Sequence, residues 1–225
     1  MARRKNQTAA REALIAAAMT ALDEGGPGDL QIRDVARVAG VTPGTVHYYF
    51  DDRDTLLRAV HAAASDRFYS ARLERVTTIP DGRAKIEALI ESGLPAADGD
   101  PLVRSLYRLA GYRAATDDHG DLLGALYDKQ VAVYVGALEV GVAQGFFHLI
   151  APVITIARHL VALEDAYGLH IIGGNRTLTR VDAIELIAAY ARMVTGCPDI
   201  HAAPEDGAGD PEDDPDPEPT EEPAP

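Results

Sequence analysis

Apolar residues recur three and four positions apart along most of the chain, which is the spacing of one face of an α-helix. In the first such segment, residues 9–22, Thr8 is a plausible N-cap. A run of three glycines and a proline at 25–28 stops the segment. No stretch alternates apolar and polar residues for long enough to predict a strand. The pattern therefore predicts an all-α protein.

Further helices follow at regular intervals. We expect a short helix over 32–39, a tight turn at Gly40, and a short helix over 43–49 that Thr42 caps and Pro43 begins. Asp52 is the expected N-cap of a long fourth helix that continues to about residue 76. Beyond Pro80 the pattern predicts helices over 82–94, 101–115, 118–144, 152–172 and 178–196, with glycine or proline near most junctions.

The net charge of −14 is unevenly distributed. Residues 199–225 contain 11 acids, no bases and seven prolines, with almost no large apolar side chain, which predicts a disordered acidic tail. Residues 1–76 carry a net +1 and residues 77–198 a net −4. The acidity of the whole chain therefore does not exclude a nucleic-acid-binding region in its first third.

Several classes of protein are unlike this sequence. A single cysteine excludes an intrachain disulfide framework and favours a reducing compartment. The start of the chain resembles the basic end of a signal peptide, but Arg11 and Glu12 interrupt the apolar core that such a peptide needs. The uncharged run over 140–157 contains polar residues, two glycines and Pro152, so we interpret it as a turn between helices. The expected location is the cytoplasm.

Residues 31–53 carry the strongest functional signal. Two short helices joined by a glycine-containing turn form a helix-turn-helix, whose second helix can enter a DNA major groove. We expect Val41, Val46 and Phe50 to anchor the second helix. The side chains left to face outward, with hydroxyls and an imidazole suited to phosphate or base contacts, are Thr42, Pro43, Gly44, Thr45, His47, Tyr48 and Tyr49. Tyr48 and Tyr49 have the alternative role of core aromatics.

Over residues 8–60 the chain resembles the TetR family of bacterial one-component transcription regulators. The resemblance rests on the segments Ile-Arg-Asp-Val-Ala-Arg-Val-Ala-Gly-Val, Gly-Thr-Val-His-Tyr-Tyr-Phe and Asp-Arg-Asp-Thr-Leu-Leu, in that order after a first helix and Gly-Gly-Pro. The remainder resembles the family in its helical layout, with a loose similarity to a choline-regulator-like branch at residues 160–169.

The resemblance implies roles for individual residues. The recognition helix is 42–49, with Thr45 and Tyr49 at positions that commonly touch DNA. His47 stands where a tyrosine usually contacts phosphate, and Pro43 where lysine or another polar residue is frequent. Arg53 matches a basic residue that grips the DNA backbone. A flexible basic arm before the first helix corresponds to Arg3, Arg4 and Lys5.

The second half lacks a recognisable catalytic motif. Glu164 and Asp165 are adjacent and so point to different sides of a helix, and His159 and His170 are too far apart for one metal. We therefore predict neither an enzyme nor a metal or cofactor site. A pocket between bundle helices is expected instead. Its candidate lining residues, each of which has the alternative role of an ordinary core or surface residue, are Tyr107, Arg108, Tyr112, Tyr127, Val131 and Tyr134.

The last two predicted helices have the length and apolar content of a subunit interface. A stripe of Ile187, Tyr190, Ala191 and Val194 is the expected contact, and the family resemblance implies a four-helix interface between two copies. Two-fold symmetry would then place two recognition helices about one DNA turn apart on a near-palindromic operator.

Together these features predict three regions. They are a DNA-binding helix-turn-helix domain with a basic arm (1–52), a larger helical ligand-binding and dimerisation domain entered through the fourth helix (53–198), and the acidic tail (199–225). The expected function is that of a homodimeric repressor that a small molecule releases from double-stranded DNA. The alternative is a helical small-molecule-binding module without sequence-specific DNA binding. The effector, the operator and the target genes stay open.

Overall fold

The structure is a computed structural model that describes residues 2–25, 30–95, 103, 105–107, 109 and 117–201. These residues form helices and connecting turns, and no strand occurs among them. The helices are α1 (Ala2–Gly25), α2 (Ile32–Ala39), α3 (Pro43–Tyr49), α4 (Arg53–Thr77), α5 (Gly82–Gly93), α7 (Asp117–Ala143), α8 (Val153–Ile172) and α9 (Arg180–Thr195). The all-α prediction is confirmed.

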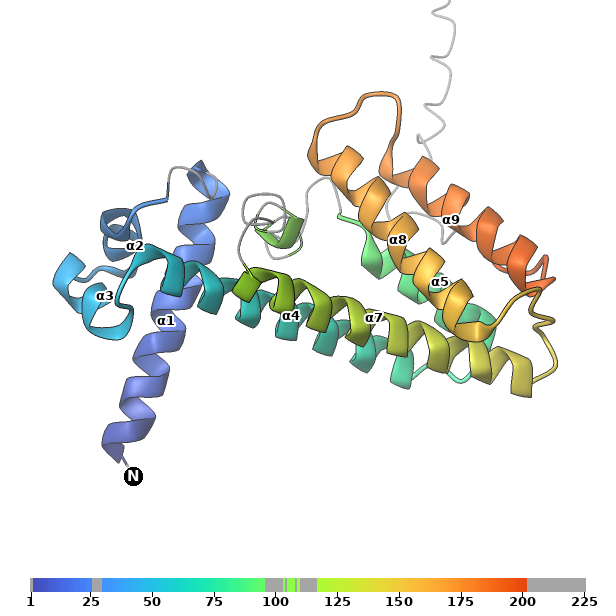
Figure 1. Ribbon diagram of the computed structural model, residues 1–225, viewed down its shortest axis with the longest axis horizontal. Helices are drawn as coiled ribbons and strands as arrows, with labels where there is room; N and C mark the ends of the chain where they lie inside the picture. The colour runs from blue at the N-terminus through green and yellow to red at the C-terminus, as the bar shows by residue number, and fades with distance from the viewer. Residues whose placement is uncertain are drawn as a thin grey trace, which may run out of the picture.

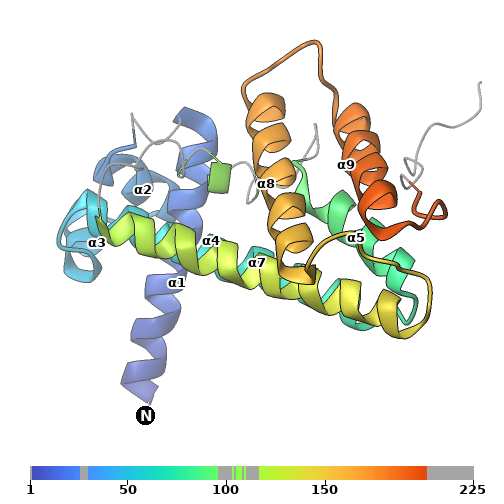
Figure 2. The same cartoon turned by 45° about the vertical axis from the view of Figure 1, so that its right-hand side comes forward.

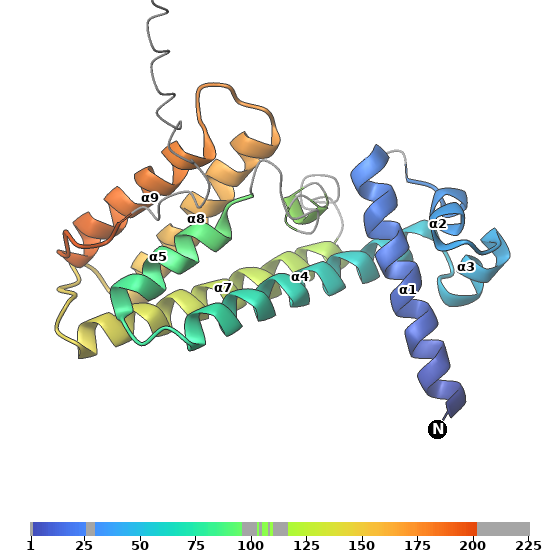
Figure 3. The same ribbon diagram turned by 180° about the vertical axis from the view of Figure 1, so that it is seen from behind.

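The helices form two unequal groups that α4 connects (Figure 1). The first three helices lie together at one end, and α4 extends from them into a larger bundle with α7 alongside it. A view turned by 45° shows α8 and α9 rising above α7 (Figure 2). Seen from behind, α5 lies within the same bundle, on the side of α4 that Figure 1 hides (Figure 3).

Local signals in the sequence explain the helix ends. Thr42 accepts a hydrogen bond from the Thr45 amide (3.3 Å) and Asp52 accepts one from the Thr55 amide (2.6 Å), so both predicted N-caps are confirmed. Gly40 adopts a left-handed conformation (φ 67°) that a residue with a side chain adopts at a cost, which allows the tight turn between α2 and α3. The predicted bounds of α2 and α3 are confirmed.

Three hydrophobic clusters follow one another along α4. Its first half contributes Leu56, Leu57 and Val60 to the cluster shared with α1, α2 and α3. Its middle contributes Ala64 and Phe68 to a small cluster with Leu126 of α7 and residues 103 and 106. Its end contributes Val76 to the large core of α5, α7, α8 and α9. Because α4 belongs to all three clusters, a change in its tilt alters the packing at both ends of the molecule.

Two expectations about the N-terminal region are wrong. The first helix begins at Ala2 and not after Thr8, so Arg3, Arg4 and Lys5 belong to α1 rather than to an extended arm. Alanine, arginine, lysine and glutamine all favour helices, and no breaker separates Ala2 from Thr8. Val41 is 38% exposed and therefore does not anchor α3, whereas Val46 and Phe50 are buried as expected.

The stripe expected at the subunit interface is also wrong. Ile187, Ala191 and Val194 are buried in the core of their own chain, and Tyr190 packs partly against it. Periodicity shows that a helix has an apolar face but not which neighbour covers that face. In this chain the neighbouring helices of the same bundle cover it, so any partner must meet the opposite side of α9.

The folded region extends past the predicted start of the tail. Ile200 is fully buried in the large core, and Arg192 Nη1 donates a hydrogen bond to its carbonyl (2.9 Å). One apolar residue in an acidic segment is enough to dock these last residues. The rest of the expected tail, and most of the helix expected over 101–115, lie outside the described residues.

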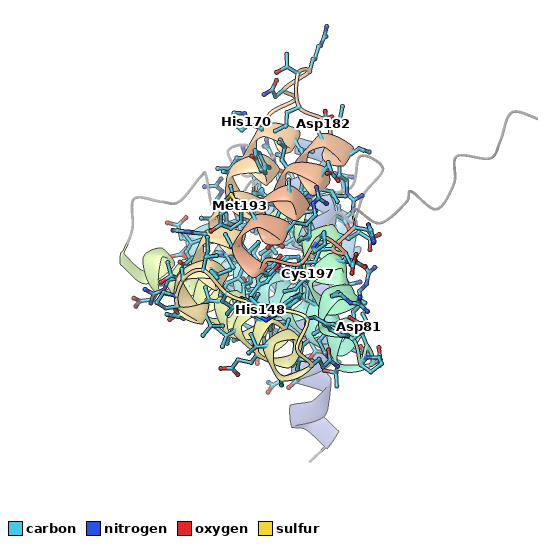
Figure 4. The ribbon with its side chains drawn as sticks, turned by 90° about the vertical axis from the view of Figure 1, so that its right-hand side faces the viewer. Asp81, His148, His170, Asp182, Met193 and Cys197 are labelled. Carbon is cyan, nitrogen blue, oxygen red and sulfur yellow. The ribbon has the colours of Figure 1, made fainter. Side chains whose placement is uncertain are left out.

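The uncharged run over 140–157 connects two helices, as expected. It contains the end of α7, a loop and the start of α8. The loop is fixed by the end of α9, since the His148 amide donates to the Thr195 carbonyl (2.7 Å). Figure 4 labels His148 and Cys197 at this end of the bundle. Within the part of the chain that the structure describes, no helix is long and apolar enough to cross a membrane.

Candidate DNA-binding and effector-binding sites

The outward face of α3 carries most of the residues predicted to contact DNA. Pro43, Gly44, His47 and Tyr48 are exposed, with Tyr48 at 70%. Thr45 and Tyr49 are half-buried, and the hydroxyls of Thr42 and Thr45 lie 3.0 Å apart. Val46 lies on the buried side of the helix. The helix therefore presents hydroxyls, an imidazole and a phenol to solvent, which suits contacts with phosphates and base edges.

The beginning of α1 lies beside this face. Gln7 Nε2 donates a hydrogen bond to the Tyr48 hydroxyl (3.3 Å). The predicted basic residues Arg4 and Lys5 lie within one turn of Gln7 on the same helix. The structure therefore brings the basic start of α1 to the recognition helix.

Arg53 makes a contact that the sequence did not predict. Its Nε donates a hydrogen bond to the Leu30 carbonyl (2.6 Å), so its guanidinium links the start of α4 to the segment that precedes α2. The side chain is partly buried. Arg53 therefore has a structural contact in addition to the DNA contact that the sequence predicts.

A partly open pocket of about 90 Å³ lies in the larger bundle, between α4, α7, α8 and the segment 103–109. The end of α5 reaches it through Gly93. Most of its wall is apolar or aromatic, and the described lining residues are His61, Phe68, Gly93, Val103, Leu106, Tyr107, Leu123, Leu126, Tyr127, Gln130 and Asp165. Such a mixture, mainly apolar with a few polar groups, is typical of small-molecule sites.

A buried ion pair stands directly behind the pocket. Arg72 of α4 donates from Nη2 to Glu164 Oε1 of α8 (2.7 Å) and from Nη1 to Oε2 (3.0 Å). The guanidinium also donates to Gln130 Oε1 (2.6 Å) and to the Leu89 carbonyl (2.8 Å). The Tyr134 hydroxyl donates to Glu164 Oε1. Because Gln130 lines the pocket, the ion pair and the pocket share a residue.

The electrostatics of this cluster follow from burial and pairing. Burial lowers the pKa of Arg72, but the charges of Glu164 and Tyr134 and the hydrogen bonds with them together outweigh that effect and leave the pKa raised, so the guanidinium stays charged. Burial raises the pKa of Glu164, and Arg72 opposes the rise. Three hydrogen bonds are donated to the carboxylate, an arrangement that suits its ionised form. Burial also raises the pKa of Tyr134 far above its usual value, so this hydroxyl remains a donor.

Two glycines allow this close packing. A Cβ on Gly93 would lie 2.0 Å from Glu164 Oε1, and a Cβ on Gly168 would lie 2.1 Å from the Tyr107 hydroxyl. Tyr107 uses that hydroxyl to donate to the Glu164 carbonyl (3.2 Å). Its ring is thereby held as a wall of the pocket.

Asp165 is the carboxylate that faces the pocket among the described lining residues. It follows Glu164 directly, and the two point apart, as expected for neighbours on a helix. Asp165 is an exposed residue, but neighbouring protein atoms partly desolvate its carboxylate. This partial desolvation raises the pKa of Asp165 to about 6, with the charge of Arg72 opposing the rise.

The predicted ligand-binding residues are only partly brought together. Tyr107 and Tyr127 line the pocket. Tyr134 is fully buried beside it as the partner of Glu164, and Val131 is part of the large core. Arg108 and Tyr112 lie outside the residues whose side chains the structure describes.

Sequence reasoning missed Arg72, Gln130 and Glu164, as well as the pocket role of Asp165. A weak signal was available, since Arg72 continues the four-residue spacing of Ala64 and Phe68 on the apolar face of α4. A charge at such a position has to find a partner. Within the described residues, no group of three or more His, Cys, Asp or Glu is arranged to hold a metal.

Comparison with known proteins identifies the N-terminal helices. Residues 14–60 match the family model of bacterial regulatory proteins of the tetR family. The repressor KstR2 from Rhodococcus jostii is 26% identical over 61% of this chain and 67% of its own length. The regulator BetI from Klebsiella pneumoniae is 35% identical over 36% of this chain, and the match spans 42% of BetI.

Residues 14–60 are therefore similar to the N-terminal domain of TetR-family transcription regulators. Helices α2 and α3 are the helix-turn-helix of the DNA-binding domain. The two relatives are transcription regulators by name, not enzymes.

Solved structures match the fold along most of the chain. A transcriptional regulator from Saccharomonospora viridis in complex with choline has a TM-score of 0.74 at 21% identity, covering 82% of this chain and 96% of that one. FadR from Bacillus subtilis in complex with stearoyl-CoA has a TM-score of 0.65 at 17% identity, covering 82% and 98%. The two neighbours hold ligands of unlike chemistry, so the shared fold does not indicate which class of ligand suits this pocket.

Proposed function

We propose that this protein is a TetR-family repressor, and that a small molecule bound in the pocket between α4, α7 and α8 releases it from its operator. The observation that carries the proposal is the position of α4. Its first half is packed into the DNA-binding helices, and its middle supplies His61 and Phe68 to the pocket. A ligand that favours one tilt of α4 thereby favours one position of α3.

The proposed DNA contacts are the exposed residues of α3, together with the start of α1. Among them, His47 and Tyr48 are exposed, and Thr45 on the same helix is half-buried. Arg4 and Lys5 belong to the first turns of α1, so part of the positive charge of this domain lies at the end of α1 that meets α3. Arg53 is proposed to fix the start of α4 and to approach the DNA backbone from there.

A second copy of the chain is the proposed partner of α8 and α9. Their outer side carries exposed apolar residues, among them Leu169, Leu186 and Met193, at 46–63% exposure. Met193 is labelled on α9 in Figure 4. His159 of α8 and Tyr190 of α9 are hydrogen-bonded (2.8 Å), which joins the two helices along this side. An apolar face of this kind is costly to leave in water, and two-fold pairing would cover it.

DNA binding tests the function directly. Fluorescence anisotropy would compare DNA from upstream of the gene with scrambled DNA across a salt series. We expect selective binding that weakens steeply with salt. His47→Ala should weaken operator binding about ten-fold, whereas His148→Ala, on the distant α7–α8 loop, should not change it. Equal binding of both DNAs would contradict the proposal.

The proposed interface has its own test. Leu186→Glu and Met193→Glu should shift the protein from dimer to monomer in light scattering coupled to size exclusion. Val142→Glu places the same charge on an exposed apolar position of α7 and should leave the dimer intact. Dimers that persist in both interface variants would place the contact elsewhere.

A further inference from the structure

The recognition helix lacks the side chains that most often distinguish bases in the major groove. Arginine and lysine make paired hydrogen bonds to guanine, asparagine and glutamine make them to adenine, and carboxylates accept from cytosine. None of these six residue types occurs between Thr42 and Tyr49. The first arginine after α3 is Arg53, which donates to the Leu30 carbonyl (2.6 Å). Sequence preference at α3 therefore needs another kind of contact.

Three hydroxyls on and beside α3 are already hydrogen-bonded within the protein. The Thr42 hydroxyl accepts from the Thr45 amide (3.3 Å) and lies 3.0 Å from the Thr45 hydroxyl. The Tyr48 hydroxyl accepts from Gln7 Nε2 (3.3 Å). A base that displaced one of these partners would exchange one hydrogen bond for another, so the net gain would be small.

Apolar surface is exposed at the start of the same helix. Pro43, at the first helical position, is exposed, and Val41, in the turn before it, is 38% exposed. Covering such surface is favourable because it removes apolar groups from water. In helix-turn-helix proteins the N-terminal residues of the recognition helix contact the base edges. The exposed apolar groups therefore lie where α3 is expected to meet the bases.

The residue after Pro43 has no side chain, and the packing of the protein does not require this. Among the described residues, a Cβ on Gly44 would meet the Thr42 hydroxyl oxygen at 3.8 Å, an ordinary contact, and no closer atom. The backbone of Gly44 is not in the left-handed region either. Glycine within a helix is less favourable than alanine. What Gly44 does allow is a close approach of the α3 backbone to another molecule.

We infer that Val41, Pro43 and Gly44 form a surface that recognises thymine through its C5-methyl group. In the major groove this methyl distinguishes thymine, and apolar side chains recognise it by contact. The backbone at Gly44 approaches the base pair, and the two apolar side chains cover the methyl. The inference rests on the proposed function in that α3 enters the major groove of an operator. It adds the chemistry by which the operator is recognised.

Base analogues test the inference before the operator sequence is known. The upstream DNA of the anisotropy experiment is synthesised with deoxyuridine in place of every thymidine, which removes the methyl and keeps the hydrogen-bonding groups. We expect the full chain to bind this uracil DNA about ten-fold more weakly or worse, because each helix α3 of the proposed dimer loses at least one methyl contact, worth about four-fold. Scrambled DNA with the same replacement should bind as scrambled thymine DNA does.

A second analogue tests the competing contact, a hydrogen bond from His47 to guanine. Upstream DNA with 7-deazaguanine in place of guanine lacks the N7 acceptor and keeps every thymine methyl. It should bind nearly as tightly as the unmodified DNA. A larger loss with 7-deazaguanine than with uracil overturns the inference.

Variants connect the methyl to the residues. Pro43→Ala should weaken binding of the thymine DNA about three-fold or more and leave binding of the uracil DNA nearly unchanged, because the contact it removes is absent there. Pro152→Ala trims an exposed proline at the start of α8 and should alter neither. Val41→Ala is compared in the same way with Val142→Ala, at an exposed valine of α7. Equal losses on both DNAs would show that the variants act through the stability of α3, which overturns the assigned roles.

The same measurements separate failure of the inference from failure of the proposed function. If the unmodified upstream DNA binds no more tightly than scrambled DNA, the proposed function fails and the inference fails with it. If the upstream DNA is preferred and its uracil form is preferred equally, the function stands and the recognition of thymine methyls is overturned.

Discussion

The DNA-binding helices and the larger bundle differ in where their functional side chains lie. In the first, the core is wholly apolar and the functional side chains lie outside on α3. In the second, functional candidates lie inside, where Arg72 and Glu164 interrupt the core. Every buried polar or charged side chain among the described residues occurs from His61 onward.

This difference has a physical basis. A surface that meets DNA can take its polar groups from exposed positions, so its core is free to be a simple apolar one. A pocket for a polar ligand has to bring polar groups into the interior, and each of these needs a partner. The ion pair, Gln130 and Tyr134 satisfy one another, which leaves Asp165 to face the ligand.

The largest effect is expected from breaking the buried ion pair. Glu164→Ala leaves Arg72 charged and buried without its main partner, which should cost about 3–5 kcal/mol in the free energy of unfolding. Glu185→Ala breaks a surface ion pair with Arg192 and should cost less than about 1 kcal/mol. Urea denaturation followed by circular dichroism measures both.

The double variant Arg72→Met with Glu164→Leu serves as the control for that experiment. Replacing both charges with apolar groups removes the uncompensated charge, so the double variant should recover part of the loss. If the double variant is as unstable as the two single losses added together, the pair is not coupled as the geometry implies.

The same difference explains which parts of the molecule could be predicted from the sequence. The helix-turn-helix is local, because 23 consecutive residues, 31–53, contain its turn, caps and outward face. Its bounds and its caps were therefore predictable from neighbouring residues. The pocket is not local, because Arg72, Gln130 and Glu164 are separated by up to 92 residues. Their meeting depends on how α4, α7 and α8 pack, and spacing within one helix carries no such information.

The same limit explains the wrong interface stripe. Ile187 and Ala191 were correctly predicted to be apolar and to share one face of a helix. Whether that face meets its own chain or another depends on the neighbouring helices. The exposed apolar residues on the opposite side, such as Leu186 and Met193, form a weaker pattern because polar residues separate them.

A smaller effect, on stability, is expected from pH. The raised pKa of Asp165, about 6, means that its carboxylate is ionised above that pH and protonated below it. This carboxyl should therefore add stability at low pH, and that contribution should be lost as the pH rises through about 6. Urea denaturation at several pH values measures this, and Asp165→Asn should remove this part of the pH dependence.

Other titratable groups near Asp165 call for a second control. His61 and Arg72 come from α4, Tyr107 from the segment 103–109, Tyr127 from α7 and Glu164 from α8. His61→Asn removes the imidazole. A pH dependence that disappears in His61→Asn but persists in Asp165→Asn would assign the titration to the histidine.

The smallest effect is expected at the N-cap of the recognition helix, and it tests the stability of the DNA-binding helices. Thr42→Ala removes the hydrogen bond to the Thr45 amide and should cost about 1 kcal/mol, with Thr42→Ser restoring most of it. Because α3 is short and its functional side chains are exposed, the loss should appear as faster hydrogen exchange of the α3 amides, while ligand affinity in the distant pocket stays unchanged. Exchange that accelerates equally in α7 and α8 would show that the DNA-binding helices and the larger bundle unfold as one unit. The two regions would then differ in where their functional side chains lie but not in their stability.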